Sequence, residues 1–247
     1  MKTNIISSSY TALGSRQVNE DSLGHFASSQ GDLFVLCDGL GGHGMGEIAS
    51  ALVVRSLGES FDKYQGGREE EFLRSALEKA QDELLLEQQK QNARRGMKTT
   101  AVLLLIRERA AWLAHIGDSR LYVFRKNKVW KRTLDHSIPQ MLALAGEIRE
   151  SDIRQHPERS SLLRVMGTEW DGPPYEIDHF SLRKCQAFLL CSDGFWELIE
   201  EAEMERLLEE SAGPEEWLKK MRSSVMSAGA DREMDNNTAI AVWCERP

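Results

Sequence analysis

The chain has 247 residues, 41% of them hydrophobic and 28% charged, which is the composition of an ordinary soluble globular protein. Its net charge of -8 argues against non-specific binding of nucleic acid, which requires a basic face. No apolar run approaches the length of a membrane span, and the first residues lack an apolar core long enough for a signal peptide. We therefore expect neither a nucleic-acid nor a membrane partner.

The cysteines exclude two kinds of site. None of the four forms a CxxC pair, so a zinc ribbon or a thioredoxin-like site is disfavoured. Cys37, Cys191 and Cys244 lie within or beside apolar runs and are expected to be small core residues. Reduced thiols favour a cytoplasmic protein.

The first part of the chain predicts three strands and then two helices. The strands are expected at residues 5–13, 22–27 and 33–38, with glycine-rich and polar breaks between them. Apolar residues then recur at helical spacing over residues 49–61 and again over 73–84. Gly66 and Gly67 separate these two segments, which predicts a helical hairpin.

A second block of strands follows, and its elements alternate irregularly with short helices. Residues 101–106 form a continuous apolar run, as expected for a strand covered on both faces. The short connections after it favour antiparallel pairing. The further expected strands are 110–117, 121–125, 128–133, 175–180, 187–192 and 238–244. Helices are expected at 136–145, 151–156, 195–199, 202–210 and 214–226, and a loop at 167–174.

This order predicts an α+β fold, because it lacks the strict alternation of a parallel α/β protein. It fits antiparallel sheets packed together with helices outside. The chain contains no internal repeat, low-complexity tract or proline-rich linker. We therefore expect one domain over residues 1–247.

Four aspartates stand where an apolar run begins or ends: Asp38, Asp118, Asp193 and Asp235. A carboxylate at the end of a buried strand is costly unless a positive charge compensates it. Several such ends on one sheet rim would gather carboxylates, the ligands that Mg²⁺ and Mn²⁺ prefer. The sequence therefore predicts a metal site at one rim.

Each motif also has an ordinary explanation when it is taken alone. Arg16 with Glu20 and Asp21 could form a surface salt bridge, and the glycines after Asp38 could simply turn the chain into a helix. Residues 117–120 resemble a hairpin turn, and the other two aspartates lie in common turn sequences. The case depends on the conjunction, since independent turns have no reason to gather so many acids.

The motifs together resemble the metal-dependent protein serine/threonine phosphatases, the PPM or PP2C-like family, in its bacterial form. The resemblance covers nearly the whole chain and implies an α-β-β-α sandwich of two central antiparallel sheets flanked by helices. Its pieces, in order, are RQVNED, LCDGLGGHGMGEIAS, MKTTAVLLLI, HIGDSRLYVFR, LDHS, HPERSSLLRVMG, LLCSDGFWELI and DNNTAIAV.

The resemblance implies a role for each matching residue. Asp38 would bridge two Mn²⁺ or Mg²⁺ ions, and the Gly39 carbonyl would face one of them. Asp193 and Asp235 would hold one ion, while Glu20 would serve the other, directly or through water. Asp118 would form a third, weaker site with Asp193. Arg16 would grip the substrate phosphate, and Asp21 and Asn236 would support the metal ligands.

The implied reaction is hydrolysis of phosphoserine and phosphothreonine in proteins. Two ions roughly 3.5–4 Å apart bind a water molecule and lower its pKa towards about 7, which yields hydroxide for direct attack on phosphorus. The catalytic set is then Arg16, Asp38 and Asp193, with no serine or cysteine nucleophile. The planar fork of Arg16 suits phosphate oxygens.

The identity of the group that donates a proton to the leaving oxygen stays open, because Leu40 stands where some relatives carry a histidine. His43 is one alternative and a metal-bound water is another. We expect His136 to cap the helix region after it and His115 to be packed inside its strand. Residues 137–172 match the flap of the family, a loop region beside the active site. Three arginines of this segment either contact a phosphoprotein or are ordinary surface charges: Arg149, Arg154 and Arg164.

The expected partners are phosphorylated proteins and a cognate bacterial serine/threonine kinase, and the expected state is a monomer. Two other functions remain as alternatives. One is a phosphoesterase for small phosphate esters, since a fold alone does not decide the substrate. The other is an inactive module that binds phosphoproteins, although inactive members usually lose metal-binding acids and none is missing here.

Overall fold

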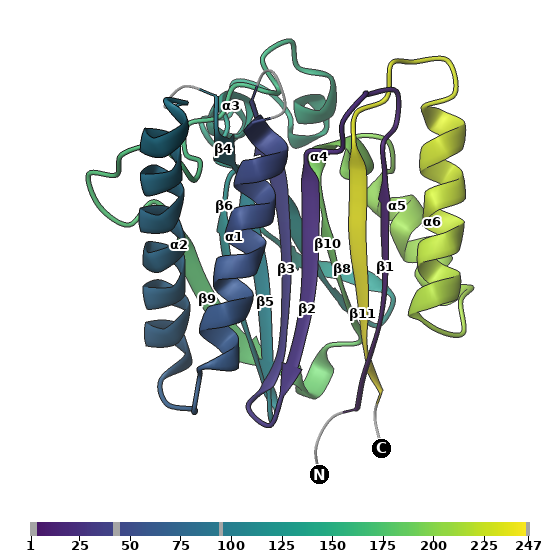
Figure 1. Ribbon diagram of the computed structural model, residues 1–247. Coiled ribbons are helices and arrows are strands. Elements are labelled where there is room, and N and C mark those ends of the chain that lie inside the picture. Colours follow the sequence, from purple (N-terminus) through teal and green to yellow (C-terminus); the bar gives the residue numbers. More distant parts are fainter. Residues whose placement is uncertain (1–3, 42–44, 94–95, 246–247) are drawn as a thin grey trace.

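Two antiparallel sheets packed face to face form the centre of the molecule, and helices cover both outer faces (Figure 1). The computed structural model describes residues 4–41, 45–93 and 96–245. The predicted α-β-β-α sandwich is confirmed. Within the described residues, no helix has both the length and the apolar character needed to cross a membrane.

The first sheet has the strand order β1-β11-β10-β7-β8. Its register pairs the start of β11 with the end of β1, and the end of β10 with the start of β7. These strands are β1 (Asn4–Ala12), β7 (Arg120–Arg125), β8 (Lys128–Arg132), β10 (Ala187–Cys191) and β11 (Asn237–Glu245).

The second sheet has the order β2-β3-β5-β6-β9, and the short β4 pairs with β3. Strand β5 is buried along nearly its whole length, as its continuous apolar run predicted. These strands are β2 (Asp21–Ser28), β3 (Gly31–Leu40), β4 (Lys98–Thr99), β5 (Ala101–Arg107), β6 (Ala110–Ile116) and β9 (Glu176–Ser181).

The period-two alternation of each strand divides its side chains between two cores. On β3, Phe34 and Leu36 pack between the sheets, where they join Phe188 and Leu190 of β10. The alternate residues of β3 turn outward and join the core under the helices. Each sheet is therefore buried on both faces, and the core between the sheets fixes one against the other.

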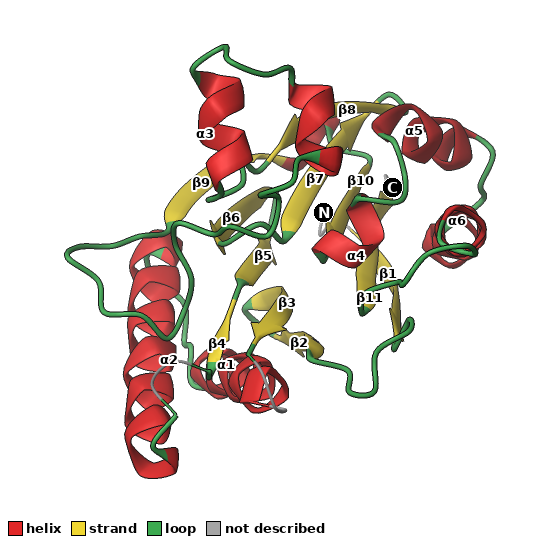
Figure 2. Ribbon diagram, turned by 90° about the horizontal axis from the view of Figure 1, so that it is seen from above, coloured by secondary structure: helices red, strands yellow, loops and turns green. Residues whose placement is uncertain are grey.

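The helical hairpin covers the second sheet, and the later helices cover the first (Figure 2). The hairpin consists of α1 (Met45–Asp62) and α2 (Glu69–Gln91), as the apolar spacing predicted. The other face carries α4 (Asp193–Trp196), α5 (Glu201–Glu209) and α6 (Pro214–Ala228). The remaining helices are α3 (Ile138–Leu144) and the 3-10 turns η2 (Glu150–Gln155) and η3 (Leu182–Lys184).

Three details differ from the sequence prediction. The segment between β6 and β7 is not a hairpin turn, because β6 lies in the second sheet and β7 in the first. Residues 117–119 instead carry the chain across the sandwich. The helix expected at 195–199 begins two residues earlier, at Asp193, and ends at Trp196. The short helix expected at 151–156 is a 3-10 helix and covers residues 150–155.

Candidate metal centre and active site

The strand ends that carry the predicted acids meet at one rim of the sandwich. In the second sheet, Asp21 at the start of β2 pairs in register with Asp38 near the end of β3. In the first sheet, β10 ends two residues before Asp193 and β11 begins two residues after Asp235. Asp118 lies in the crossing between the sheets. The five aspartates thus reach the rim from both layers.

Asp38 is fixed by the backbone on both sides of it. Its N–H donates to the Thr100 hydroxyl over 2.9 Å, and its carbonyl accepts from the Thr99 hydroxyl over 2.8 Å. A side chain at Gly39 would meet the Gly46 carbonyl oxygen at 2.3 Å, so only glycine fits this close approach between β3 and α1. The backbone therefore aims one carboxylate at the rim with little freedom.

The carboxylates at the rim repel one another. Burial raises the pKa of Asp38 well above its ordinary value, and the charges of Asp21, Asp193 and Asp118 raise it further. Burial also raises the pKa of Asp118 and of Asp193, and each feels a neighbouring aspartate next. The carboxyl groups of Asp38 and Asp193 also interact directly. The rim is therefore short of positive charge.

The donor set of this rim suits hard divalent cations, which prefer carboxylate oxygens. One oxygen of Asp21, Oδ1, is buried without a hydrogen-bond partner, which also fits a cation nearby. As they stand, no three His, Cys, Asp or Glu side chains in the described part of the chain are arranged as a complete metal site. The ion pair with Arg16 must open before the Asp235 carboxylate can bind a cation.

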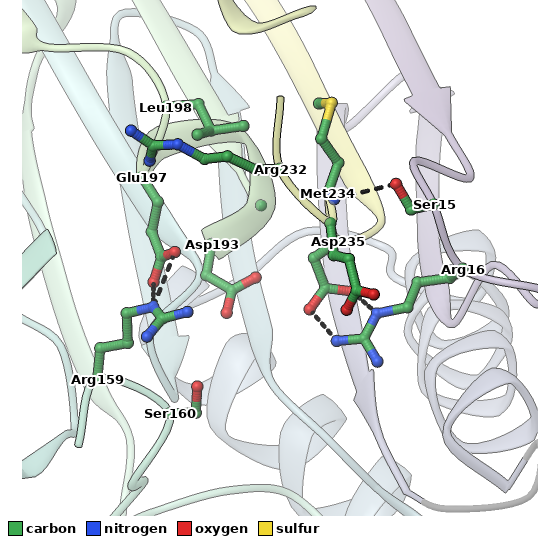
Figure 3. Close-up of a pocket in the computed structure, with 12 residues that line it drawn as sticks. Ser15, Arg16, Arg159, Ser160, Asp193, Glu197, Leu198, Arg232, Met234 and Asp235 are labelled. Atoms are coloured by element: carbon green, nitrogen blue, oxygen red, sulfur yellow. Dashed lines mark hydrogen bonds and ion pairs between the residues drawn. The ribbon is translucent and has the colours of Figure 1, made fainter. Parts of the chain in front are cut away.

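Arg16 engages Asp235 through both ends of its guanidinium fork. Nε donates to Oδ1 over 2.9 Å and Nη2 donates to Oδ2 over 2.6 Å (Figure 3). The hydrogen bond to Asp235 raises the pKa of Arg16 above its ordinary value. The residue expected to hold phosphate and a residue expected to hold metal thus contact each other directly.

Asn236 joins the first sheet to the segment before β2. Its Oδ1 accepts from the Glu20 N–H over 2.8 Å, and its Nδ2 donates to the carbonyls of Leu13 and Val18. Asp21 accepts from the Ser192 hydroxyl over 2.9 Å, and burial raises its pKa. Through these hydrogen bonds both residues contact the segments that carry Glu20 and Asp193.

A cavity of about 530 Å³ opens beside the rim. Asp193, Asp235 and Arg16 line it, together with Arg159 and Glu197, which the sequence did not single out (Figure 3). Arg159 Nε donates to Glu197 over 3.1 Å. Burial raises the pKa of Glu197 to about 7, and the charge of Asp193 adds to the shift.

Helical spacing in the sequence indicates Glu197 as a neighbour of Asp193. The two residues are four positions apart, which places them one turn apart on the same helix face. Arg159 carries no such signal. The arginines that the sequence did single out lie elsewhere: Arg149 pairs with Asp152, and Arg154 is buried against Glu201. Arg164 is exposed.

The role of His136 also differs from expectation. Ser137, not His136, caps α3 by accepting from the Gln140 N–H. His136 instead accepts from the Gly117 N–H over 3.1 Å and stacks on His115 at 4.6 Å between ring centroids. This ring pair holds the crossing between the sheets, a tertiary contact that local sequence does not signal. His115 is packed, as expected, and His43 lies outside the described residues.

Solved structures place this sandwich in a known class. The crystal structure of the serine/threonine phosphatase Stp1 from Staphylococcus aureus matches with a TM-score of 0.91 and 30% identity, covering 100% of this chain and 97% of that one. The catalytic domain of the phosphatase PstP in complex with two manganese ions matches with a TM-score of 0.85 and 25% identity, covering 100% of both chains. The fold is that of the bacterial metal-dependent phosphatases.

Sequence comparison gives the family. A model described as protein phosphatase 2C matches residues 10–236. The serine/threonine phosphatase stp of Listeria welshimeri is 30% identical over 234 residues, which span 92% of this chain and 90% of that protein. The chain therefore belongs to the protein phosphatase 2C family, and the resemblance carried by its motifs is confirmed.

Proposed function

We propose that this enzyme hydrolyses phosphoserine and phosphothreonine in proteins, with Mn²⁺ or Mg²⁺ held at the acidic rim. The observation that supports the proposal most is the convergence of aspartates from both sheets beside a cavity that also contains Arg16 and Arg159. The relatives named serine/threonine phosphatases agree with it. No serine or cysteine is needed as nucleophile.

In this proposal Asp38, Asp193, Asp235, Glu20 and the Gly39 carbonyl would hold two divalent ions. Two such ions supply Lewis acidity and a water molecule of lowered pKa for in-line attack. The rigid backbone at Asp38 keeps its carboxylate in register with the other ligands. Asp21 and Asn236 fix the segments that carry Asp193 and Glu20.

The cavity supplies the substrate phosphate with guanidinium groups. Arg16 offers a planar fork that matches two phosphate oxygens. When substrate binds, the Arg16 guanidinium leaves the Asp235 carboxylate and donates to the phosphate of the ester instead. That exchange frees the Asp235 carboxylate for a cation. One movement thus prepares both the phosphate contact and a metal ligand.

The test compares the protein with its Asp38→Ala variant in Mn²⁺, with phosphothreonine peptides as substrates. We expect phosphate release by the native chain and almost none by the variant. Equal release by the two, across several peptides, refutes the proposal. Faster turnover of free small esters than of a phosphothreonine protein would favour a small-ester phosphoesterase, and binding of phosphopeptide without release would favour an inactive module.

We propose that the partners are phosphoproteins and a cognate serine/threonine kinase, that the domain acts as a monomer, and that it works in the cytoplasm. The compact site supports the monomer, because residues of one chain supply all its groups. Sedimentation of the purified chain tests the monomer. Incubation with a kinase-phosphorylated protein and detection of the remaining phosphothreonine test the partner class.

A further inference from the structure

The indole of Trp196 connects two parts of the acidic rim. Trp196 ends α4, the short helix that Asp193 begins. Its Nε1 donates to the Asp118 carbonyl over 3.0 Å, and the ring is only 2% exposed. One buried hydrogen bond therefore joins the segment of Asp193 to the segment of Asp118, which come from different strand ends.

Arg120 packs against the ring of Trp196. Its guanidinium carbon lies 3.4 Å from the centroid of the Trp196 ring, a close cation–π arrangement. Both ends of its fork donate to Asp135, over 2.8 and 2.7 Å, and the Arg120 side chain is 3% exposed. Since a bidentate buried pair has little rotational freedom, Arg120 presents a fixed surface against which the indole is seated.

None of these three side chains lines the cavity beside the rim. Their contacts instead hold the backbone segments that carry Asp118 and Asp193. Asp118 can approach Asp193 only as closely as the crossing between the sheets permits, and the indole N–H fixes the backbone of that crossing. The neighbouring Ser119 hydroxyl is hydrogen-bonded to Thr100 over 2.7 Å, which secures the same segment to the strand beside Asp38.

We propose that Trp196 and Arg120 are positioning residues that set the spacing of the Asp118 and Asp193 carboxylates and thereby the affinity of the cation bound between them. This inference rests on the proposed function, because it assumes that the rim holds divalent ions. Groups behind metal ligands typically change metal affinity by about 10–100-fold when they are removed. The indole acts through a main-chain carbonyl, so we expect the lower end of that range.

The chain offers a matched control for the indole. Trp217 is also fully buried, and its Nε1 donates to the Met204 carbonyl over 3.0 Å, between α6 and α5. Trp196→Phe and Trp217→Phe each remove one buried indole N–H and the hydrogen bond that it donates to a main-chain carbonyl. They differ in where that carbonyl lies: at the acidic rim in the first variant, and between two outer helices in the second.

The experiment measures Mn²⁺ binding to both variants and to the native protein by calorimetry, without substrate, and records thermal unfolding in parallel. We expect the weaker class of bound Mn²⁺ to lose about 10-fold in affinity in Trp196→Phe and to change less than about twofold in Trp217→Phe. Both variants should lose thermal stability. A common loss of stability with identical Mn²⁺ isotherms overturns the inference.

A second variant decides the matter if Trp196→Phe does not fold. Arg120→Lys keeps the positive charge but loses the fork to Asp135, so it should weaken the same class of Mn²⁺, and an unchanged isotherm overturns the inference. Native protein that binds Mn²⁺ as described yet releases no phosphate from phosphopeptides refutes the proposed function alone. Native protein with full phosphatase activity and unaltered variants refutes the positioning role alone.

Discussion

Removing Arg16 should strengthen metal binding while it weakens substrate binding. In the structure, both ends of the Arg16 fork hold the Asp235 carboxylate, so a cation has to displace the guanidinium before it can use this ligand. The side chains are 61% and 41% exposed, which places the pair among surface ion pairs. Such pairs are worth about 0.2–1 kcal/mol, and the two-pronged geometry favours the upper end.

An energy of about 1 kcal/mol corresponds to roughly a fivefold change in a dissociation constant. We therefore expect Arg16→Ala to bind Mn²⁺ about two- to fivefold more tightly than the native protein in the absence of substrate. In the same variant, the KM for a phosphothreonine peptide should rise, because the phosphate loses its fork. Calorimetry in low salt measures the first effect and steady-state kinetics the second.

Loss of any positive charge near the rim would favour a cation to some extent, so the control must remove a charge without breaking the pair. Arg232 lines the same cavity and serves this purpose. Arg232→Ala should change Mn²⁺ affinity less than Arg16→Ala does. Weaker Mn²⁺ binding in Arg16→Ala, or equal shifts in the two variants, would refute the competition between Arg16 and the metal for Asp235.

Three further results are expected. Asp193→Asn should weaken Mn²⁺ binding and nearly abolish phosphate release; near-normal turnover in saturating Mn²⁺ would contradict its role. Gly194→Ala places a methyl group 2.1 Å from the Asn236 carbonyl oxygen, so denaturant unfolding should show a loss of about 1–3 kcal/mol. Gly213→Ala, which meets no atom within 4 Å, is its control. Burial lowers the pKa of His136 to about 3, so this residue should make the protein less stable as the pH falls below about 6.5.

The sign of the pH effect follows from the protons bound in each state. Below its ordinary pKa the unfolded His136 binds a proton that the buried ring does not, so acid favours unfolding. The contribution is complete above about pH 6.5 and falls by about 1.4 kcal/mol per pH unit below it. His136→Asn keeps an acceptor for the Gly117 N–H, and its stability should depend less on pH between 6.5 and 5. Parallel curves for variant and native protein would exclude this role.

The sequence predicted the layers well because burial on each face leaves a periodic mark. The apolar run of β3 predicted a strand, the continuous run of β5 predicted a strand covered on both faces, and the helical spacing identified α1 and α2. The acids were detectable for a related reason, since a charge directly after a buried run is unusual. Asp38 and Asp193 therefore emerged as candidates before their neighbours in space were known.

The remaining features depend on contacts between distant segments. Arg159 meets Glu197 across 38 positions of sequence, and no local pattern marks Arg159. The crossing at residues 117–119 has the composition of a hairpin turn, and only the pairing of β6 and β7 with different sheets distinguishes it. His136 likewise resembled a helix cap until its ring was found against His115.

The apolar layer between the sheets has a consequence for how the enzyme can be tuned. Glu20 and Asp38 lie at strand ends of one sheet, and Asp193 and Asp235 lie beside strand ends of the other. The thickness of this layer therefore sets how far apart the two groups of proposed ligands stand. Protein interiors are packed as densely as organic crystals and transmit small changes in volume. A single methylene gained or lost beside Phe34 or Phe188 therefore changes the separation between the carboxylates of the two sheets. Mutations deep in the sandwich can thus alter turnover without touching a charged group.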